Sequence, residues 1–177
     1  FVKVPVFSFS KLTRVDVTLG PEMKSTGEVM GKDSTLEKAL YKGLIGAGRK
    51  VPLHGSILFT IDDVNKPEAA KLAKRFYDIG FKIWATRGTS RYFNELNIPT
   101  KIGYKIEEET ENLISLIQKG KVQYVVNTTT KGKQSMNDGF LIRRTSVENG
   151  VPCLTSMDTV EAMLKVIESM TFKMEKM

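Results

Sequence analysis

The amino-acid sequence predicts an α/β fold with an open, parallel, five-stranded sheet covered by helices on both faces. One observation is that short apolar runs alternate with amphipathic helix patterns from Ser56 onward. Another is that the clearest run, Ser56–Ile61, is continuously apolar, as buried parallel strands are. A third is that residues 1–50 do not follow this alternation. We therefore expect a short α+β segment over 1–50 and the α/β domain over 52–177.

In the N-terminal segment, apolar residues alternate with others around Val4, which predicts a strand. The stretch Leu19–Gly31 mixes Gly, Pro, apolar and charged residues and is expected to be a structured loop. Ser34–Glu37 has the form of a capping box and opens a predicted helix that ends near Gly46. Arg49–His54 is basic, contains Pro and lacks periodicity, so we interpret it as the boundary.

In the α/β domain, each apolar run is followed by a helix pattern. The first helix begins near Pro67, where a missing N–H costs least, and Gly80 closes it. Residues Phe140–Val147, and a helix after them, are expected to lead into the last strand. The predicted strands are 56–61, 81–86, 98–104, 122–127 and 151–155, and the other predicted helices lie around 92–96, 113–120 and 158–167. The apolar face of the first helix, which is expected to pack inward, consists of Ala69, Leu72, Ala73, Phe76 and Tyr77.

Composition excludes several classes of function. The net charge of +7 is spread along the chain without interleaved aromatic residues, which argues against nucleic-acid binding. The single cysteine, Cys153, excludes an internal disulfide and fits a reducing, cytoplasmic compartment. Because His54 is also the single histidine, a Cys/His metal site is excluded. No apolar run approaches the roughly 18 residues of a membrane span. The chain lacks a signal-peptide pattern and begins at Phe1, so we expect it to be part of a longer protein.

One stretch has the pattern of an anion site. The apolar strand that ends at Ala85 continues into Thr86–Ser90, which is rich in hydroxyl groups, and a helix pattern follows at Tyr92. A helix start offers unpaired N–H groups and a positive dipole end, and Thr or Ser adds hydroxyl donors. The alternative is an ordinary turn in which Thr or Ser caps the helix.

Other loops are expected to converge on this stretch, because ligands bind outside the carboxyl ends of the strands in open α/β sheets. Lys66 follows the first strand, Asn127–Lys133 follows the fourth, and Lys105 lies just past the third. Hydroxyls, helix-start amides and ammonium groups at one edge fit a phosphate or a phosphorylated small molecule. Asp62 and Asp63 have no histidine partner, and no nucleophile–base pair is evident, so we expect a binder and not a catalyst.

Several motifs closely resemble the carboxyl-terminal end of the carbamoyl-phosphate synthase large subunit, and the resemblance covers essentially the whole chain. They are Leu19–Gly31, His54–Gly55, Ala85–Thr89, Asn127–Thr129 and Ile142–Arg144. The resemblance implies that residues 1–50 are the tail of the second ATP-grasp unit and residues 52–177 a methylglyoxal-synthase-like allosteric domain.

The resemblance also implies properties of the parent enzyme. It is an ATP-dependent, Mg- or Mn-requiring ligase of pyrimidine and arginine biosynthesis, supplied with ammonia by a small glutaminase subunit and able to form homo-oligomers. Its ATP- and metal-binding residues would precede Phe1, so the present chain would contain no catalytic residue, metal site or cofactor of its own.

In that family the allosteric domain binds nucleotide effectors, and UMP inhibits. The resemblance places the effector contacts on Lys66, Thr86, Thr89, Lys105, Asn127 and Thr129. Where ornithine-regulated members have acidic residues, this chain has Leu154 at one position, and the other falls near Val4, so ornithine activation is not expected. UMP inhibition and activation by phosphoribosyl pyrophosphate are the working hypotheses; which effector dominates is left open.

Two rival interpretations remain at this point. One is a free-standing lyase similar to methylglyoxal synthase, acting on dihydroxyacetone phosphate. That enzyme uses a His and an Asp, whereas no His stands near Arg87 here, and the Glu22–Gly31 motif has no place in it. The other is a scaffold domain that binds no ligand.

Overall fold

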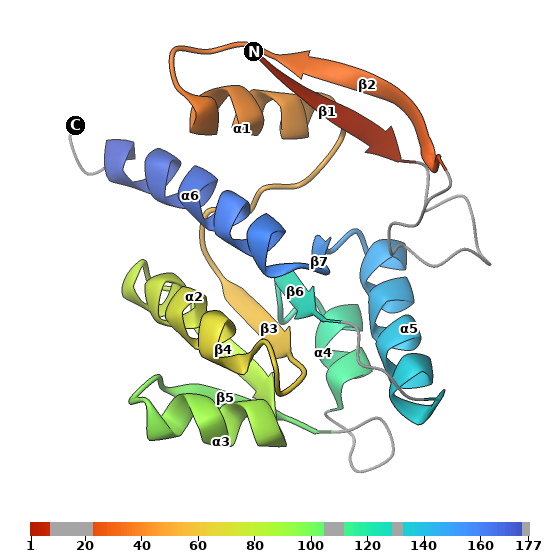
Figure 1. The fold of residues 1–177 in the computed structure, drawn as a ribbon, viewed down its shortest axis with the longest axis vertical. Helices are drawn as coiled ribbons and strands as arrows, with labels where there is room; N and C mark the ends of the chain where they lie inside the picture. The colour runs from red at the N-terminus through yellow and green to blue at the C-terminus, as the bar shows by residue number, and fades with distance from the viewer. Residues whose placement is uncertain (8–22, 105–111, 129–132, 175–177) are drawn as a thin grey trace.

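A computed structural model describes residues 1–7, 23–104, 112–128 and 133–174 (Figure 1). Its main element is a five-stranded sheet of order β5-β4-β3-β6-β7, in which all neighbouring strands are parallel. This confirms the predicted α/β class. The strands are β3 (Ser56–Thr60), β4 (Lys82–Thr86), β5 (Thr100–Gly103), β6 (Tyr124–Asn127) and β7 (Cys153–Leu154).

The strand order creates a switch point in the middle of the sheet. From β3 the chain steps outward to β4 and β5, and then returns to the other side of β3 to form β6 and β7. The connections leaving β3 and β6 therefore run to opposite faces of the sheet. Ligands bind at the carboxyl ends of such a strand pair, which here are Thr60 and Asn127.

Helices cover both faces, as predicted (Figure 1). On one face α2 (Lys66–Asp78), α3 (Arg87–Glu95) and α6 (Met157–Met174) pack on the larger apolar cluster. At its centre the buried Phe59 ring meets Phe76 and Phe93 edge to face, with ring centroids 6.4 and 5.5 Å away. On the other face α4 (Leu113–Gln118) and α5 (Lys133–Glu148) cover the smaller cluster around Leu58 and Val125.

The N-terminal segment is a second, two-stranded sheet with one helix. Strand β1 (Val2–Phe7) pairs antiparallel with β2 (Ser25–Gly31), and α1 (Leu36–Gly46) packs against both. The predicted loop over Leu19–Gly31 is therefore wrong for residues 25–31. Strand β2 carries two glycines and only one apolar side chain on the face toward α1, so its sequence lacks a strand pattern. A Cβ on Gly31 would lie 2.0 Å from the Ala39 carbonyl oxygen, so the glycine allows α1 to approach.

The start of α1 also differs from the predicted capping box. Thr35, not Ser34, caps the helix, with its Oγ1 accepting from the Lys38 amide at 3.4 Å. Ser34 instead donates through its amide and its hydroxyl to Asp33 Oδ1. Hydrogen bonds from the Lys42 ammonium and from the Ser34 amide lower the pKa of the Asp33 carboxyl.

The apolar core crosses the predicted boundary between the two parts of the chain. Leu40, Tyr41 and Leu44 of α1 pack against the larger cluster, and α1 contacts α6 (Figure 1). The Tyr124 hydroxyl donates to the Pro52 carbonyl oxygen at 3.0 Å, and burial raises the pKa of this phenol. The division into residues 1–50 and 52–177 stays a prediction.

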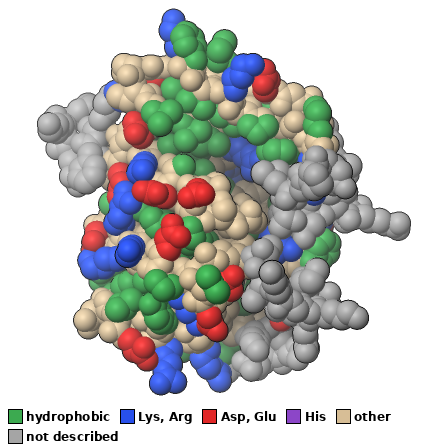
Figure 2. Space-filling view, in the orientation of Figure 1, with side chains coloured by type: hydrophobic (Ala, Val, Ile, Leu, Met, Phe, Trp, Pro, Cys, Tyr) green, Lys and Arg blue, Asp and Glu red, His purple; other side chains and the backbone are tan. Residues whose placement is uncertain are grey.

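Figure 2 shows hydrophobic side chains gathered over the N-terminal sheet and helix at the top of the view. Phe1, Met30 and Leu36, which belong to this part of the chain, are all exposed. In the part of the chain that the structure describes, no helix combines the length and the apolar character needed to cross a membrane.

Two helices of the main domain begin earlier than predicted. Helix α3 starts at Arg87, directly after β4, so Thr89 and Ser90 lie in its first turn and not in a loop. Helix α5 begins at Lys133, whereas the sequence placed a helix after Phe140–Val147. In α3 the first residues are polar, so the apolar periodicity becomes visible only further along the helix. Tyr77 of α2 is 43% exposed, so the inward face predicted for this helix was too wide.

Candidate functional site

The carboxyl ends of four strands line up at one edge of the sheet. Gly103 of β5 is in register with Thr86 of β4, and Thr60 of β3 with Asn127 of β6. Because Phe59 pairs with Ala85, Thr60 stands beside Thr86. The strand ends that the sequence predicted to converge therefore lie side by side, with Thr60 between Thr86 and Asn127.

The Lys66 ammonium lies over the first turn of α3. A Cβ built on Gly88 would be 3.7 Å from Lys66 Nζ. The start of α2 therefore lies close to the start of α3. The Lys66 side chain is only 17% exposed, and its Nζ pairs at 2.5 Å with the Asp63 carboxylate, which is 92% exposed. Because the carboxylate of this pair is exposed, solvent screens the interaction, and another anion can take the place of the carboxylate.

The N-cap residue of α3 makes no capping hydrogen bond through its side chain. This residue is Thr86, and its hydroxyl donates instead to Thr89 Oγ1 at 3.1 Å. Thr89 is buried and donates in turn to the Ile61 carbonyl oxygen at 3.5 Å. The simple alternative, in which a Thr or Ser side chain caps this helix, is therefore not what the structure forms. The helix-start amides and the Lys66 ammonium face a common position that suits an anion.

Ser90, the last residue of the predicted loop, has a structural role. It is buried, and its hydroxyl lies 2.6 Å from that of Thr100 at the start of β5. Its oxygen also accepts from the Asn94 side chain at 3.3 Å. These contacts connect α3 to β5. Ser90 therefore does not join the side chains at the carboxyl ends of the strands.

A second polar network lies under the switch point. Arg143 of α5 donates from Nη1 to Asn127 Oδ1 at 2.7 Å, and Asn127 Nδ2 lies 2.7 Å from Thr60 Oγ1. The Thr60 hydroxyl donates to the Val126 carbonyl oxygen at 3.1 Å. All three side chains are buried. The sequence predicted Asn127 here but missed Thr60 and Arg143, because periodicity does not distinguish a buried arginine from a surface one.

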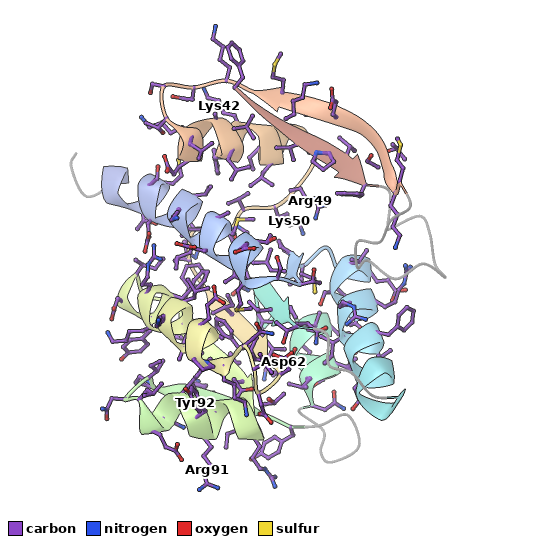
Figure 3. The ribbon with its side chains drawn as sticks, viewed as in Figure 1. Lys42, Arg49, Lys50, Asp62, Arg91 and Tyr92 are labelled. Carbon is purple, nitrogen blue, oxygen red and sulfur yellow. The ribbon has the colours of Figure 1, made fainter. Side chains whose placement is uncertain are left out.

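The loops leaving β3 and β6 are joined just above this network. The Asp62 amide donates to Thr128 Oγ1 at 3.0 Å, and the Thr128 amide donates to the Thr60 carbonyl oxygen at 3.3 Å. Asp62 Oδ1 accepts from the amide and the side chain of Asn65 at 3.1 and 2.6 Å. Asp62, labelled in Figure 3, thus shapes the turn between β3 and α2. The only histidine, His54, precedes β3 and so lies toward the opposite edge of the sheet.

A polar hollow of about 300 Å³ lies on the α6 side of the switch point. Glu68 and Asp158 line it, and no residue of the predicted site does. Two carboxylates repel an anion, so we place the anion position at Lys66 and the α3 start and not in this hollow. The other lining residues are Asn65, Thr128, Thr155, Ser156 and Met157.

The predicted site residues thus fall into three groups. Lys66, Thr86 and Thr89 come together at the start of α3, although Thr89 is buried. Asn127 stands two strands from Thr86, or roughly 10 Å at the usual strand spacing. Lys105 and Thr129 lie outside the described residues.

Comparison with protein families matches residues 68–155 to the model of the MGS-like domain. The match extends from the first turn of α2 to just after β7. It includes Thr86, Thr89 and Asn127, and it begins two residues after Lys66. The chain therefore contains an MGS-like domain.

Proposed function

Given this MGS-like domain, we propose that the chain is the allosteric region of a glutamine-dependent carbamoyl-phosphate synthase large subunit. In this proposal it binds a phosphorylated effector, with UMP as the leading candidate, and so controls ATP-dependent carbamoyl phosphate synthesis. The observation that carries the proposal is the Lys66 ammonium over the start of α3.

A phosphate group suits this position for a physical reason. It carries more than one negative charge near neutral pH and several strong acceptor oxygens. The Thr86 side chain makes no capping hydrogen bond at the start of α3, and the Lys66 counter-ion is an exposed carboxylate that a stronger anion can replace. A neutral ligand would satisfy neither the ammonium nor the helix dipole.

A binding role, and not catalysis, fits the groups at this edge of the sheet. The sequence has a single histidine, and it lies toward the other edge. Asp62 is held as an acceptor by Asn65, which keeps its carboxylate in the turn. In the proposed parent enzyme, catalysis with ATP and Mg or Mn, and the contact with the glutaminase subunit, belong to other parts of the protein. Cytoplasmic location and roles in pyrimidine and arginine synthesis are part of the same proposal.

The second candidate function is a methylglyoxal-synthase-like lyase acting on dihydroxyacetone phosphate. The family match favours it as much as the first, and Lys66 with the α3 start would hold a triose phosphate equally well. The lyase would need an acid–base pair beside that phosphate, and no histidine is close. A methylglyoxal-formation assay separates the two, because turnover would favour the lyase.

A thermal-shift panel tests the proposed function. We expect UMP to raise the melting temperature in a concentration-dependent way, because a ligand that binds only the folded state stabilises it by mass action. IMP and phosphoribosyl pyrophosphate are tested beside it, and ornithine is expected to have no effect. A folded chain that shows no shift with any phosphorylated compound would support the scaffold interpretation.

Asp63→Asn is expected to strengthen UMP binding by up to about fivefold. The substitution removes the carboxylate that pairs with Lys66, and an exposed pair of this kind contributes roughly 0–1 kcal/mol. Titration of both proteins with UMP measures the change, and Asp78→Asn, at an exposed ion pair elsewhere on α2, is the matched control. Weaker binding by the Asp63 variant would mean that this carboxylate assists the ligand.

A further inference from the structure

We propose that Arg143 is a positioning residue of the effector site, which fixes Asn127 as a hydrogen-bond donor toward the bound ligand. This inference rests on the proposed function and deepens it. It adds a second requirement to the ligand: beyond its phosphate, the ligand must carry an acceptor oxygen that reaches the Asn127 amide.

The direction of the hydrogen bonds in this network follows from the chemistry of the groups. An arginine side chain has only donors, so the Asn127 atom 2.7 Å from Arg143 Nη1 must be the amide oxygen. The amide nitrogen then faces Thr60 and donates to its hydroxyl at 2.7 Å. The Thr60 hydroxyl donates its own hydrogen bond to the Val126 carbonyl oxygen. The donors in this series therefore follow one direction, from Arg143 to Asn127, from Asn127 to Thr60, and from Thr60 to the Val126 carbonyl oxygen.

This direction determines what Asn127 can offer a ligand. Its oxygen is held by Arg143, and one of its two Nδ2 hydrogens is donated to Thr60. The second Nδ2 hydrogen is what the amide can present at the switch point, so a ligand must meet it with an acceptor. Rotating the amide by half a turn would bring two donors together at Arg143, which the buried contact does not permit.

The position of Asn127 sets the size of the ligand. Two strand spacings separate it from Thr86 and the start of α3, or roughly 10 Å. A ligand whose phosphate lies at Lys66 must extend that far to reach the amide. A nucleoside monophosphate with carbonyl oxygens on its base has that length, whereas a triose phosphate or inorganic phosphate does not.

Gly139 makes room for the contact. It lies one helical turn before Arg143 in α5, and a Cβ at this position would be 3.0 Å from Arg143 Nη1 and 3.5 Å from Asn127 Oδ1. Gly139→Ala would therefore shift the guanidinium by a few tenths of an ångström and loosen its hydrogen bond to the amide, while keeping its charge. The same change favours the helix, because Ala has a higher helix propensity than Gly.

The test compares UMP with inorganic phosphate on the full chain. Arg143→Met is expected to weaken UMP binding about fivefold, the loss of roughly one oriented hydrogen bond. Gly139→Ala, which only shifts the guanidinium, is expected to weaken it in the same direction by a smaller factor. Inorganic phosphate uses only Lys66 and the α3 start, so its affinity should stay within twofold of wild type. Gly139→Ala should keep the melting temperature, which makes it the decisive variant if Arg143→Met folds poorly.

A double-mutant cycle completes the test. Asn127→Ala is expected to weaken UMP binding about fivefold in the wild-type chain and by a smaller factor in the Gly139→Ala background. Additive losses, an unchanged UMP affinity in both variants, or equal losses for UMP and inorganic phosphate would each overturn the role of Arg143. A wild-type chain that binds phosphate but not UMP would also overturn it, and one that binds neither would overturn the proposed function as well.

Discussion

Replacing Lys66 by Ala is expected to weaken UMP binding roughly 10- to 100-fold. The ammonium is mostly buried and lies over the first turn of α3, so it would make a charge-assisted hydrogen bond to the phosphate. Such a bond contributes about 1.5–3 kcal/mol, and each 1.4 kcal/mol is a tenfold change in affinity. The partner that the variant loses in the free protein is an exposed carboxylate, so stability should change little.

The control for this variant is Lys71→Ala, which removes an exposed lysine from the same helix. It changes the net charge equally but leaves the ammonium at the α3 start in place. We expect its affinity for UMP to match that of wild type within about twofold at physiological salt, where distant surface charges are screened. Similar losses in the two variants would show that Lys66 acts only through the overall charge.

Gly88→Asp is expected to abolish UMP binding, with a loss of at least about 100-fold, while the fold is kept or slightly stabilised. A Cβ at Gly88 is in ordinary contact only with Lys66 Nζ, so the side chain fits. The new carboxylate would pair with Lys66 and occupy the place of the phosphate. An acidic residue in the first turn of a helix also contributes about 0.3–1 kcal/mol through the dipole. Calorimetry and chemical denaturation measure the two opposite effects.

Gly88→Asn separates charge from bulk, because its side chain has the size of Asp but no charge. We expect this variant to bind UMP at least tenfold more tightly than Gly88→Asp does, since it neither neutralises Lys66 nor repels the phosphate. Wild-type affinity in Gly88→Asp would place the anion elsewhere, and the start of α3 would then have no role in binding.

The main sheet was predictable because its signals are local. Ser56–Thr60 is buried at every residue, and a continuous apolar run of this length fits a central parallel strand. The inner face of α2 appeared as a regular spacing that ends in Phe76. The pairing of β2 with β1 was missed because it joins Gly31 to Val2, far apart in sequence, and the apolar side of β2 contains Gly27 and Gly31.

Part of the site was predictable for a topological reason. Lys66, Thr86 and Asn127 each lie at or just after the end of a strand, and parallel strands bring those ends to one edge. The burial of Thr89 was not visible, because it depends on α3 starting at Arg87. The contact of Arg143 with Asn127 depends on the rotation of α5 about its axis, which the sequence of that helix does not specify.

Calorimetric titration of the full chain with UMP is the direct test of an effector site at Lys66 and the start of α3. We expect saturable binding of one UMP per chain, with heat that disappears in Gly88→Asp. Spectroscopic evidence of folding is collected on the same samples, so that an unfolded protein is not mistaken for a folded one that does not bind. A folded wild-type chain that gives no binding heat at millimolar UMP would contradict an effector site at Lys66 and the start of α3.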